Sequence, residues 1–428
     1  MKTIINPKTS DWKILAKRPA IAVQEMDKLV DQIFNSVMEQ GDKALIEFTQ
    51  KFDKVKKTSL KLTSQEIKKQ SQQISKDLKA AIDVAYKNIS KFHKAQVEKS
   101  KKIETSSGVV CWRESRGLEK VGIYIPGGTA PLFSTVLMLA IPAKIAGCKE
   151  IVLCTPPDKN GQINPAILYC AQRTGVTSVF AVGGIQAIGA MTFGTETIPA
   201  VSKIFGPGNQ FVTAAKKRAQ NFGVAIDMPA GPSEVLVIAD KNADPEFVAA
   251  DLLSQAEHGA DSQVILVSTS STIIQQTIDA LDKQLKKLPR KEVATEALKN
   301  SLAIQFKNES DCIRFSNLYA PEHLILACDD AEKLAAEVVN AGSVFIGKYA
   351  CESAGDYASG TNHTLPTNGY AKNYSGVSVD TFVRKITFQK ISKKGLQNIG
   401  PAIEEMAEAE QLLAHKNAVS VRLKKLNK

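Results

Sequence analysis

The chain has 428 residues, a formal net charge of +11, 43% hydrophobic residues and seven scattered cysteines. The length allows two or more domains, and the lack of any apolar run that could cross a bilayer or open a signal peptide argues against membrane and secreted proteins. No C-x-x-C pair occurs, which argues against a disulfide framework or a thiolate zinc site and favours a reducing, cytoplasmic setting.

The positive charge alone could indicate a nucleic-acid-binding protein. However, lysines concentrate between residues 51 and 102 and in the C-terminal tail. In the first of these segments they alternate with apolar residues at helical spacing, as on the solvated face of an amphipathic helix. We therefore expect no nucleic-acid partner.

The first 120 residues predict an arm over residues 1–22 followed by helices. An apolar stripe from Gln24 to about Phe52 is broken at Gly41, and Thr63 and Glu66 form a capping box that opens a long helix to about Val97. Nothing near His93 suggests a ligand role, so the sequence predicts a surface or edge histidine.

From Val121 onward, strands alternate with helices in units of roughly 30 residues, a pattern typical of a parallel sheet. The predicted elements are strands at Val121–Ile125, Glu150–Cys154, Ser178–Val182 and Lys203–Phe205, and helices at Ser134–Ala146, Pro165–Arg173, Ile185–Phe193 and Gln210–Phe222.

Three glycine-rich loops follow strands of this series: 126–128, 183–184 and 206–209. Each precedes a helix, so backbone amides and helix N-termini could bind a phosphate or a dinucleotide. The G-x-G-x-x-G fingerprint is absent, however, and glycines also serve simply as strand-to-helix turns. Spacing alone leaves both interpretations open.

A second series begins after Ser233. Its predicted strands are Val235–Ala239, Val264–Ser268, Ala303–Phe306, Leu324–Ala327 and Ser343–Ile346, and its helices include 272–285, 311–319 and 331–340. Residues 350–378 read as a long loop, and the remainder as a small helical piece ending in a short strand at Val419–Leu423. The fold class is thus α/β, with two Rossmann-like parallel-sheet domains, a terminal arm and a C-terminal helical segment.

One helix of the second series carries a candidate metal site. Asp244 and the proline after it predict the start of the helix, and Gly259 its end. Gln255 and His258 lie one turn apart near that end, on one face. Together with Asp356 and His415 they would give two nitrogen and two oxygen ligands, which suits Zn²⁺, although a polar last turn is also common without function.

Glu322 and His323 form a second candidate, because an adjacent carboxylate and imidazole could act as general acid and base. A surface glutamate beside a capped histidine is the alternative. No H-E-x-x-H motif is present, so a zincin protease is not supported.

These segments together resemble the histidinol dehydrogenase family along nearly the whole chain. The matching motifs are Val121-Gly-Ile-Tyr-Ile-Pro-Gly-Gly128, Ala130-Pro-Leu-Phe-Ser-Thr-Val-Leu-Met138, Phe205-Gly-Pro-Gly-Asn209, Pro229-Ala-Gly-Pro-Ser-Glu234, Leu253-Ser-Gln-Ala-Glu-His-Gly259, Ala320-Pro-Glu-His-Leu324, Ser353-Ala-Gly-Asp-Tyr357, Gly360-Thr-Asn-His363 and Ala414-His-Lys-Asn-Ala-Val419.

The resemblance implies an enzyme that oxidises L-histidinol to L-histidine through the aldehyde in the last step of histidine biosynthesis, with one NAD⁺ used for each of two hydride transfers. It implies one Zn²⁺ per subunit that holds the substrate. His323 would act as the base for alcohol oxidation, and Glu322 would activate water for aldehyde oxidation. The implied zinc ligands, which also contact substrate, are Gln255, His258, Asp356 and His415.

Further site residues follow from the same resemblance. Ser233, His363 and Glu410 match positions that contact substrate, as does His323, and Tyr124, Gln186 and Asn209 match positions that contact NAD⁺. The family is a homodimer whose C-terminal segment reaches the partner's site, so Glu410 and His415 would act across the interface.

The resemblance also suggests a division of the chain. Residues 1–22 would be the arm, 23–120 with 234–378 the domain of the metal and catalytic residues, 121–233 the NAD-binding domain, and 379–428 the dimer-exchange segment.

Ala260 and Cys154 are two further residues that bear on the expected chemistry. Ala260 stands where many members carry proline, but this change removes no ligand. Cys154, at the end of a strand, could form a thiohemiacetal with an aldehyde, although a packing cysteine is the commoner case.

The competing hypotheses for the function are a zinc hydrolase that uses the same residues and a basic nucleic-acid-binding protein.

Overall fold

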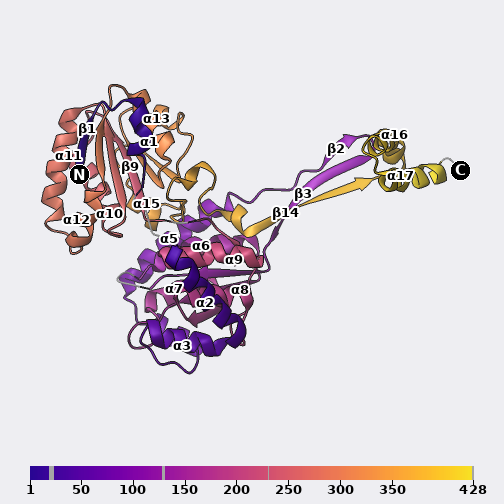
Figure 1. The fold of residues 1–428 in the computed structure, drawn as a ribbon, viewed down its shortest axis with the longest axis horizontal. Coiled ribbons are helices and arrows are strands. Elements are labelled where there is room, and N and C mark those ends of the chain that lie inside the picture. Colours follow the sequence, from indigo (N-terminus) through magenta and orange to yellow (C-terminus); the bar gives the residue numbers. More distant parts are fainter. Residues whose placement is uncertain (19–23, 128–130, 230, 427–428) are drawn as a thin grey trace.

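The computed structural model describes residues 1–18, 24–127, 131–229 and 231–426, and shows two α/β units and a long arm (Figure 1). Gly128 lies outside the described residues, and so do residues 19–22 of the predicted N-terminal arm, which is a different segment from the long arm of the structure. Within the described parts of the chain, no helix is long and apolar enough to span a membrane. The α/β class with two parallel sheets is confirmed.

The first sheet has the strand order β6-β5-β4-β7-β8, and all its neighbours are parallel. Its strands are β4 (Lys120–Tyr124), β5 (Glu150–Thr155), β6 (Ser178–Ala181), β7 (Lys203–Phe205) and β8 (Ala225–Ile226). They consist mainly of buried aliphatic residues, as expected for a parallel sheet covered on both faces. The order reverses between β4 and β7, and such switch points bind ligands at the carboxyl ends of the strands.

Eight helices of the described chain cover this sheet. Four connect its strands: α6 (Phe133–Ala146), α7 (Pro165–Thr174), α8 (Gly184–Phe193) and α9 (Gln210–Ala219). The other four precede it: α2 (Gln24–Gln40), α3 (Asp42–Phe52), α4 (Ser64–Ser71) and α5 (Lys76–Lys94). Helix α2 packs on α8 and α9, α4 on α7, and α5 on α6.

This packing corrects the predicted grouping of residues 23–120 with the unit of residues 234–378. The apolar stripe of α2 enters the same core as strands β4 to β7, with Ile33, Phe34 and Val37 against Val182 and Ile188. An apolar stripe shows that a helix is buried on one face, but it does not identify the sheet that it covers.

Two further details of the N-terminal helices differ from prediction. The capping box of Thr63 and Glu66 is confirmed, but the helix it opens ends at Ser71, and Ser75 caps a second one. His93 is fully buried rather than at the surface. Its Nδ1 lies 2.9 Å from the Ile89 carbonyl, and its Nε2 lies 3.4 Å from the Asn362 amide.

The second sheet has the order β1-β11-β10-β9-β12-β13, again entirely parallel. Its strands are β1 (Lys2–Ile5), β9 (Glu234–Ala239), β10 (Gln263–Ser268), β11 (Leu302–Gln305), β12 (His323–Ala327) and β13 (Ser343–Ile346). The predicted N-terminal arm is therefore partly an edge strand, followed by the short helix α1 (Trp12–Leu15).

The helices of this unit are α10 (Pro245–Ala256), α11 (Ser271–Leu285), α12 (Lys291–Lys299), α13 (Glu309–Tyr319), α14 (Ala331–Ala335) and α15 (Glu352–Tyr357). Helix α10 starts and ends close to the predicted residues: Asp244 accepts hydrogen bonds from the first-turn amides, and Pro245 occupies the first helical position. Helix α15 lies inside the segment predicted to be a loop.

The arm is a three-stranded antiparallel sheet that carries two helices at its tip (Figure 1). It consists of β2 (Ile103–Ser106), β3 (Val109–Gly117) and β14 (Val383–Ile391), with α16 (Lys393–Ala409) and α17 (Leu413–Leu426). The predicted strand at Val419–Leu423 is wrong, because these residues belong to α17. Strand β14 was not predicted, since most of its residues are exposed and show no buried face.

Candidate functional site

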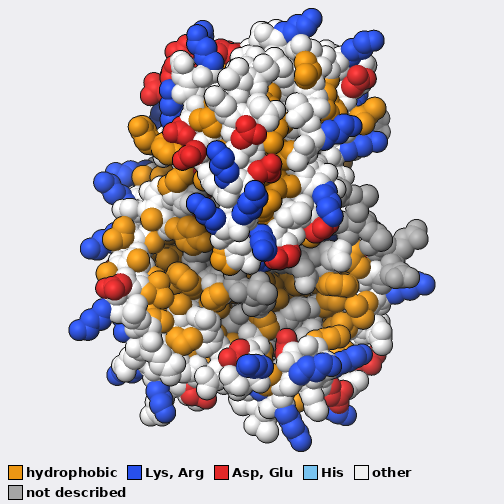
Figure 2. Space-filling view, turned by 90° about the vertical axis from the view of Figure 1, so that its left-hand side faces the viewer, with side chains coloured by type: hydrophobic (Ala, Val, Ile, Leu, Met, Phe, Trp, Pro, Cys, Tyr) orange, Lys and Arg blue, Asp and Glu red, His pale blue; other side chains and the backbone are white. Residues whose placement is uncertain are grey.

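A cavity of about 1130 Å³ lies between the two α/β units. One wall is the loop after β7, from Gly206 to Asn209, at the carboxyl edge of the first sheet. The opposite wall includes Ser233, Glu322 and His258, which lie at the amino edge of the second sheet. On the face turned away from the arm, apolar side chains gather on both sides of the junction between the units (Figure 2).

The predicted acid–base pair is deeply buried beside this cavity. His323 is the first residue of β12 and is 2% exposed, and Glu322 is 6% exposed. The backbone N–H of Glu234 donates a hydrogen bond of 2.9 Å to Glu322 Oε2, and the Glu234 carbonyl lies 3.1 Å from His323 Nδ1. Because a carbonyl oxygen can only accept, this contact places a proton on Nδ1. The other ring nitrogen, Nε2, has no hydrogen-bond partner.

Burial and neighbouring charges control the protonation of this pair. Burial raises the pKa of the Glu322 carboxyl to about 8, while the His323 imidazole and the Glu234 amide oppose the increase. Burial would lower the pKa of His323, but the carboxylates of Glu322, Asp356 and Glu352 outweigh it and raise the pKa. Both pKa shifts favour the protonated forms, and the two side chains lie close without a hydrogen bond, with His323 Nδ1 3.6 Å from Glu322 Oε2.

Three of the four predicted zinc ligands lie in one region, because Gln255 and Asp356 both lie beside His323, and Asp356 interacts electrostatically with His258. Gln255 is 1% exposed on the last turn of α10, His258 lines the cavity just beyond that helix, and Asp356 projects from α15. Asp356 Oδ1 lies 3.4 Å from His323 Nε2 without forming a hydrogen bond. Burial would raise the pKa of Asp356, but His323 outweighs this and lowers it.

The donor atoms of this group fit a metal ion. Gln255 Oε1 and Asp356 Oδ1 are both buried and lack a hydrogen-bond partner. Buried polar oxygens are normally satisfied, so two exceptions on side chains that both lie beside His323 need another partner. Two oxygens with the imidazole of His258 form a donor set that Zn²⁺ accepts. The described residues contain no group of three His, Cys, Asp or Glu side chains arranged to hold a metal ion, so the candidate donor set depends on the amide oxygen of Gln255.

The structure does not bring His415 or Glu410 to this group within one chain. Both are exposed residues of the arm, near the junction of α16 and α17. The arm carries them away from both α/β units (Figure 1).

His363 connects the two sides of the cavity. Its Nδ1 lies 2.8 Å from the Asp356 carbonyl, which can only accept, so Nε2 receives the hydrogen bond of 2.9 Å from the Thr135 hydroxyl. Thr135 belongs to α6 of the first unit, whereas Asp356 belongs to the second. His363 and Ser233 both line the cavity, as their predicted role as substrate contacts requires.

The three predicted NAD⁺ contacts lie at the carboxyl edge of the first sheet. The Tyr124 hydroxyl accepts a hydrogen bond of 3.1 Å from the Gly184 amide, and Gln186 is buried in the first turn of α8. Asn209 caps α9 through hydrogen bonds to two of its first amides and lines the cavity. Of these three side chains, only Asn209 borders the cavity.

A buried ion pair that sequence analysis missed holds the loop after β7. Lys216 Nζ lies 2.5 Å from Asp227 Oδ1 and donates to the Gly206 carbonyl at 2.8 Å. Asp227 accepts from the Gly206 amide at 2.8 Å. Gly206 has φ +129°, and a Cβ at this position would lie 2.1 Å from the Tyr124 carbonyl oxygen, so only glycine fits. The two residues are eleven positions apart, and no local sequence signal pairs them.

Cys154 is not placed for chemistry. It is fully buried in the core of the first unit, and burial raises the pKa of its thiol. A thiol of this kind is inert, which supports the packing interpretation.

The comparisons with known proteins agree along the whole chain. A family model described as histidinol dehydrogenase matches residues 16–423. Histidinol dehydrogenase from Bacteroides thetaiotaomicron is 58% identical over 426 residues, covering 100% of both chains, and the chloroplastic enzyme from Arabidopsis thaliana is 52% identical over 413 residues, covering 96% of this chain and 88% of the relative. The crystal structure of histidinol dehydrogenase from Elizabethkingia anophelis superposes with a TM-score of 0.98 at 62% identity, covering 100% of this chain and 99% of that one.

Proposed function

The chain belongs to the histidinol dehydrogenase family, and from that premise we propose that it oxidises L-histidinol to L-histidine in two NAD⁺-dependent steps at the cavity between its α/β units. The observation that carries the proposal is the group of buried, unpartnered polar atoms there. Gln255 Oε1, Asp356 Oδ1 and His323 Nε2 all lack partners in one small region next to Glu322. The two oxygen atoms could bind a metal ion, and the nitrogen atom could accept a proton from the substrate.

In the first step, His323 Nε2 takes the hydroxyl proton of the alcohol as hydride leaves the substrate carbon. The Nδ1–H bond to the Glu234 carbonyl leaves Nε2 as the accepting atom of the neutral imidazole, and the raised pKa of His323 makes that imidazole a strong base. In the second step, Glu322 takes a proton from the water that adds to the aldehyde, and the resulting hydrate anion becomes the carboxylic acid as it loses the second hydride. Burial raises the pKa of the Glu322 carboxyl to about 8, which makes its carboxylate a stronger base than an exposed glutamate.

The cofactors supply what these side chains lack. Zinc, held by Gln255, His258 and Asp356 with His415, would bind and orient the imidazole and amine of the substrate. Two NAD⁺ molecules, bound in turn at the glycine-rich edge of the first sheet near Asn209 and the loop held by Lys216 and Asp227, would each accept one hydride. A dinucleotide suits this edge, because helices α8 and α9 both begin there and helix N-termini attract phosphates.

We further propose that the active enzyme is a homodimer in which each arm completes the partner's site. Three ligands lie together in the chain, and the fourth, His415, is exposed on the arm. The helices of the arm also expose apolar side chains, including Met406, Leu412 and Leu413. A second copy of the chain would cover such residues and supply the missing imidazole.

The proposed reaction predicts a defined stoichiometry. With limiting L-histidinol and excess NAD⁺, the purified protein should form two NADH per histidinol and release histidine, because both hydrides leave the same carbon. Absorbance at the NADH maximum measures the NADH formed, and chromatography measures the histidine released. Consumption of substrate without NADH would instead favour a zinc hydrolase built from the same residues.

A further inference from the structure

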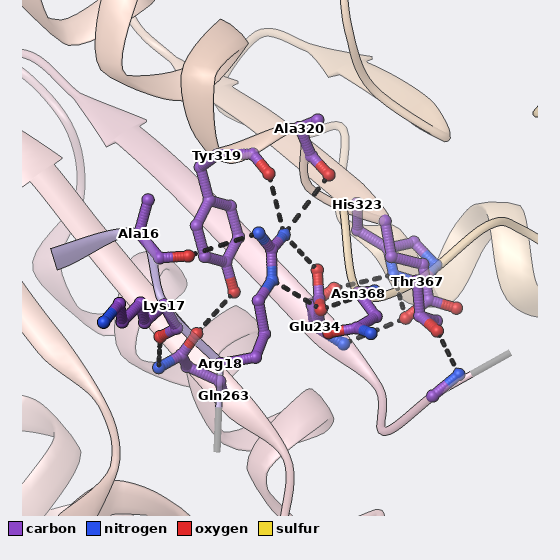
Figure 3. Close-up of polar contacts among 12 residues, drawn as sticks. Ala16, Lys17, Arg18, Glu234, Gln263, Tyr319, Ala320, His323, Thr367 and Asn368 are labelled. Atoms are coloured by element: carbon purple, nitrogen blue, oxygen red, sulfur yellow. Dashed lines mark hydrogen bonds and ion pairs between the residues drawn. The ribbon is translucent and has the colours of Figure 1, made fainter. Parts of the chain in front are cut away.

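An ion pair at the amino edge of the second sheet joins the N-terminal segment to the catalytic pair (Figure 3). Arg18 Nε lies 3.0 Å from Glu234 Oε1, and Arg18 Nη2 lies 2.9 Å from Glu234 Oε2. The two side chains are 13% and 1% exposed. This fork-to-fork geometry is specific to arginine, since a lysine ammonium cannot donate two parallel bonds.

The remaining contacts of Arg18 hold its guanidinium in place. The group lies 3.6 Å from the centre of the Tyr319 ring, and its Nη2 also donates to the Tyr319 carbonyl at 2.8 Å. The Tyr319 hydroxyl in turn donates to Gln263 at 2.8 Å. Arg18 is therefore fixed by α13 and β10 and does not merely neutralise charge.

The other end of the connection is the backbone of Glu234. Its N–H donates to Glu322 Oε2, and its carbonyl accepts from His323 Nδ1, so one residue contacts both members of the catalytic pair. Its carboxylate is held on the other side by Arg18 and by the Asn368 amide at 2.7 Å. The side chain of Glu234 thus fixes the backbone that orients Glu322 and His323.

We propose that Arg18 is a positioning residue for the oxidation, acting through Glu234 to hold Glu322 and His323 in their reactive orientation. This inference rests on the proposed function of the catalytic pair. Without Arg18, the Glu234 carboxylate would be buried with no opposite charge, a state that buried ions avoid by moving or taking up a proton. Either change shifts the Glu234 backbone and both hydrogen bonds to the pair.

The test compares Arg18→Met with Arg18→Lys, which keeps the charge but not the fork. We expect Arg18→Met to lower kcat about 100-fold, the effect of a misplacement of about 1 Å, while the KM for histidinol and the zinc content stay unchanged. The kcat of Arg18→Lys should lie between the kcat of Arg18→Met and that of the unsubstituted protein. Added guanidinium should restore part of the activity of Arg18→Met, because it can occupy the vacated space beside Tyr319.

Arg314→Met is the matched control, since Arg314 is an exposed arginine of α13 that pairs with Asp311, and its loss should leave kcat unchanged. If Arg18→Met does not fold, the kcat of Arg18→Lys decides instead, and a decrease at constant KM supports the inference. An unchanged kcat in the folded variants, or equal losses of kcat, substrate affinity and zinc, would overturn it. If the unsubstituted protein forms no NADH from histidinol, the proposed function itself fails.

Discussion

Glu322→Gln is expected to abolish oxidation of the aldehyde while leaving oxidation of the alcohol largely intact. Glutamine keeps the oxygen that accepts the Glu234 N–H, so the local structure should persist. It cannot take a proton from water, however, and loss of a general base costs about 100- to 10,000-fold in rate. We expect NADH formation from supplied histidinal to fall by that factor.

Rapid-mixing measurements with histidinol and with histidinal as separate substrates check this result. With histidinol, the variant should still deliver the first hydride and should then accumulate aldehyde. Glu332→Gln is the control, because Glu332 is an exposed glutamate on α14 of the same unit. A variant that oxidises histidinal at the normal rate would show that another group activates the water.

His258→Asn is expected to lose zinc and activity together while the fold is retained. In the proposed ligand set, the imidazole of His258 is the one nitrogen that the same chain supplies, with two oxygens from Gln255 and Asp356. Loss of an outer-shell hydrogen bond to a ligand lowers metal affinity by about 10- to 100-fold, and loss of the ligand itself should lower the zinc affinity by at least this factor. The zinc content after dialysis against a weak chelator, measured by atomic emission, reports this directly.

Glu257→Gln serves as the control for that experiment, since it changes the neighbouring residue and no proposed ligand. Circular dichroism should be the same for both variants, because His258 lies beyond the end of α10 and contributes little to the core. Stoichiometric zinc retained by His258→Asn would remove this residue from the ligand set.

The regular parts of the fold were predictable because each strand and helix has its own local signal. Buried strands such as β5 and β9 are short aliphatic runs, and α10 has both its cap and its first-turn proline in the sequence. Spacing predicted Gln255 and His258 on one face of the last turn, whereas α10 ends at Ala256 and His258 follows in a turn, where its N–H donates to the Gln255 carbonyl at 3.2 Å. The metal and catalytic assignments needed the family resemblance, because Asp356 and Glu322 are about 70 to 100 residues from Gln255 and no spacing rule joins them.

Other features depend on tertiary contacts that leave no local signal. The sequence shows that α2 is amphipathic, but only the fold shows that it covers the first sheet and not the second. His93 has an ordinary helical context, yet packing against Asn362 buries it completely. Arg18 and Glu234 are 216 residues apart, and no sequence motif contains both residues or predicts that they pair.

The central claim is that one active site is built from two chains, and hybrid dimers test it most directly. Glu322→Gln and His415→Asn should each form almost no histidine from histidinol when alone, because one lacks the proposed base for aldehyde oxidation and the other a proposed zinc ligand. After subunit exchange, a mixed dimer would contain one site with both defects and one site with neither. We predict that activity returns to about one quarter of the unsubstituted value in an equal mixture, since half the dimers are mixed and each holds one intact site. If exchange is verified by mass spectrometry and no activity returns, the shared site is contradicted.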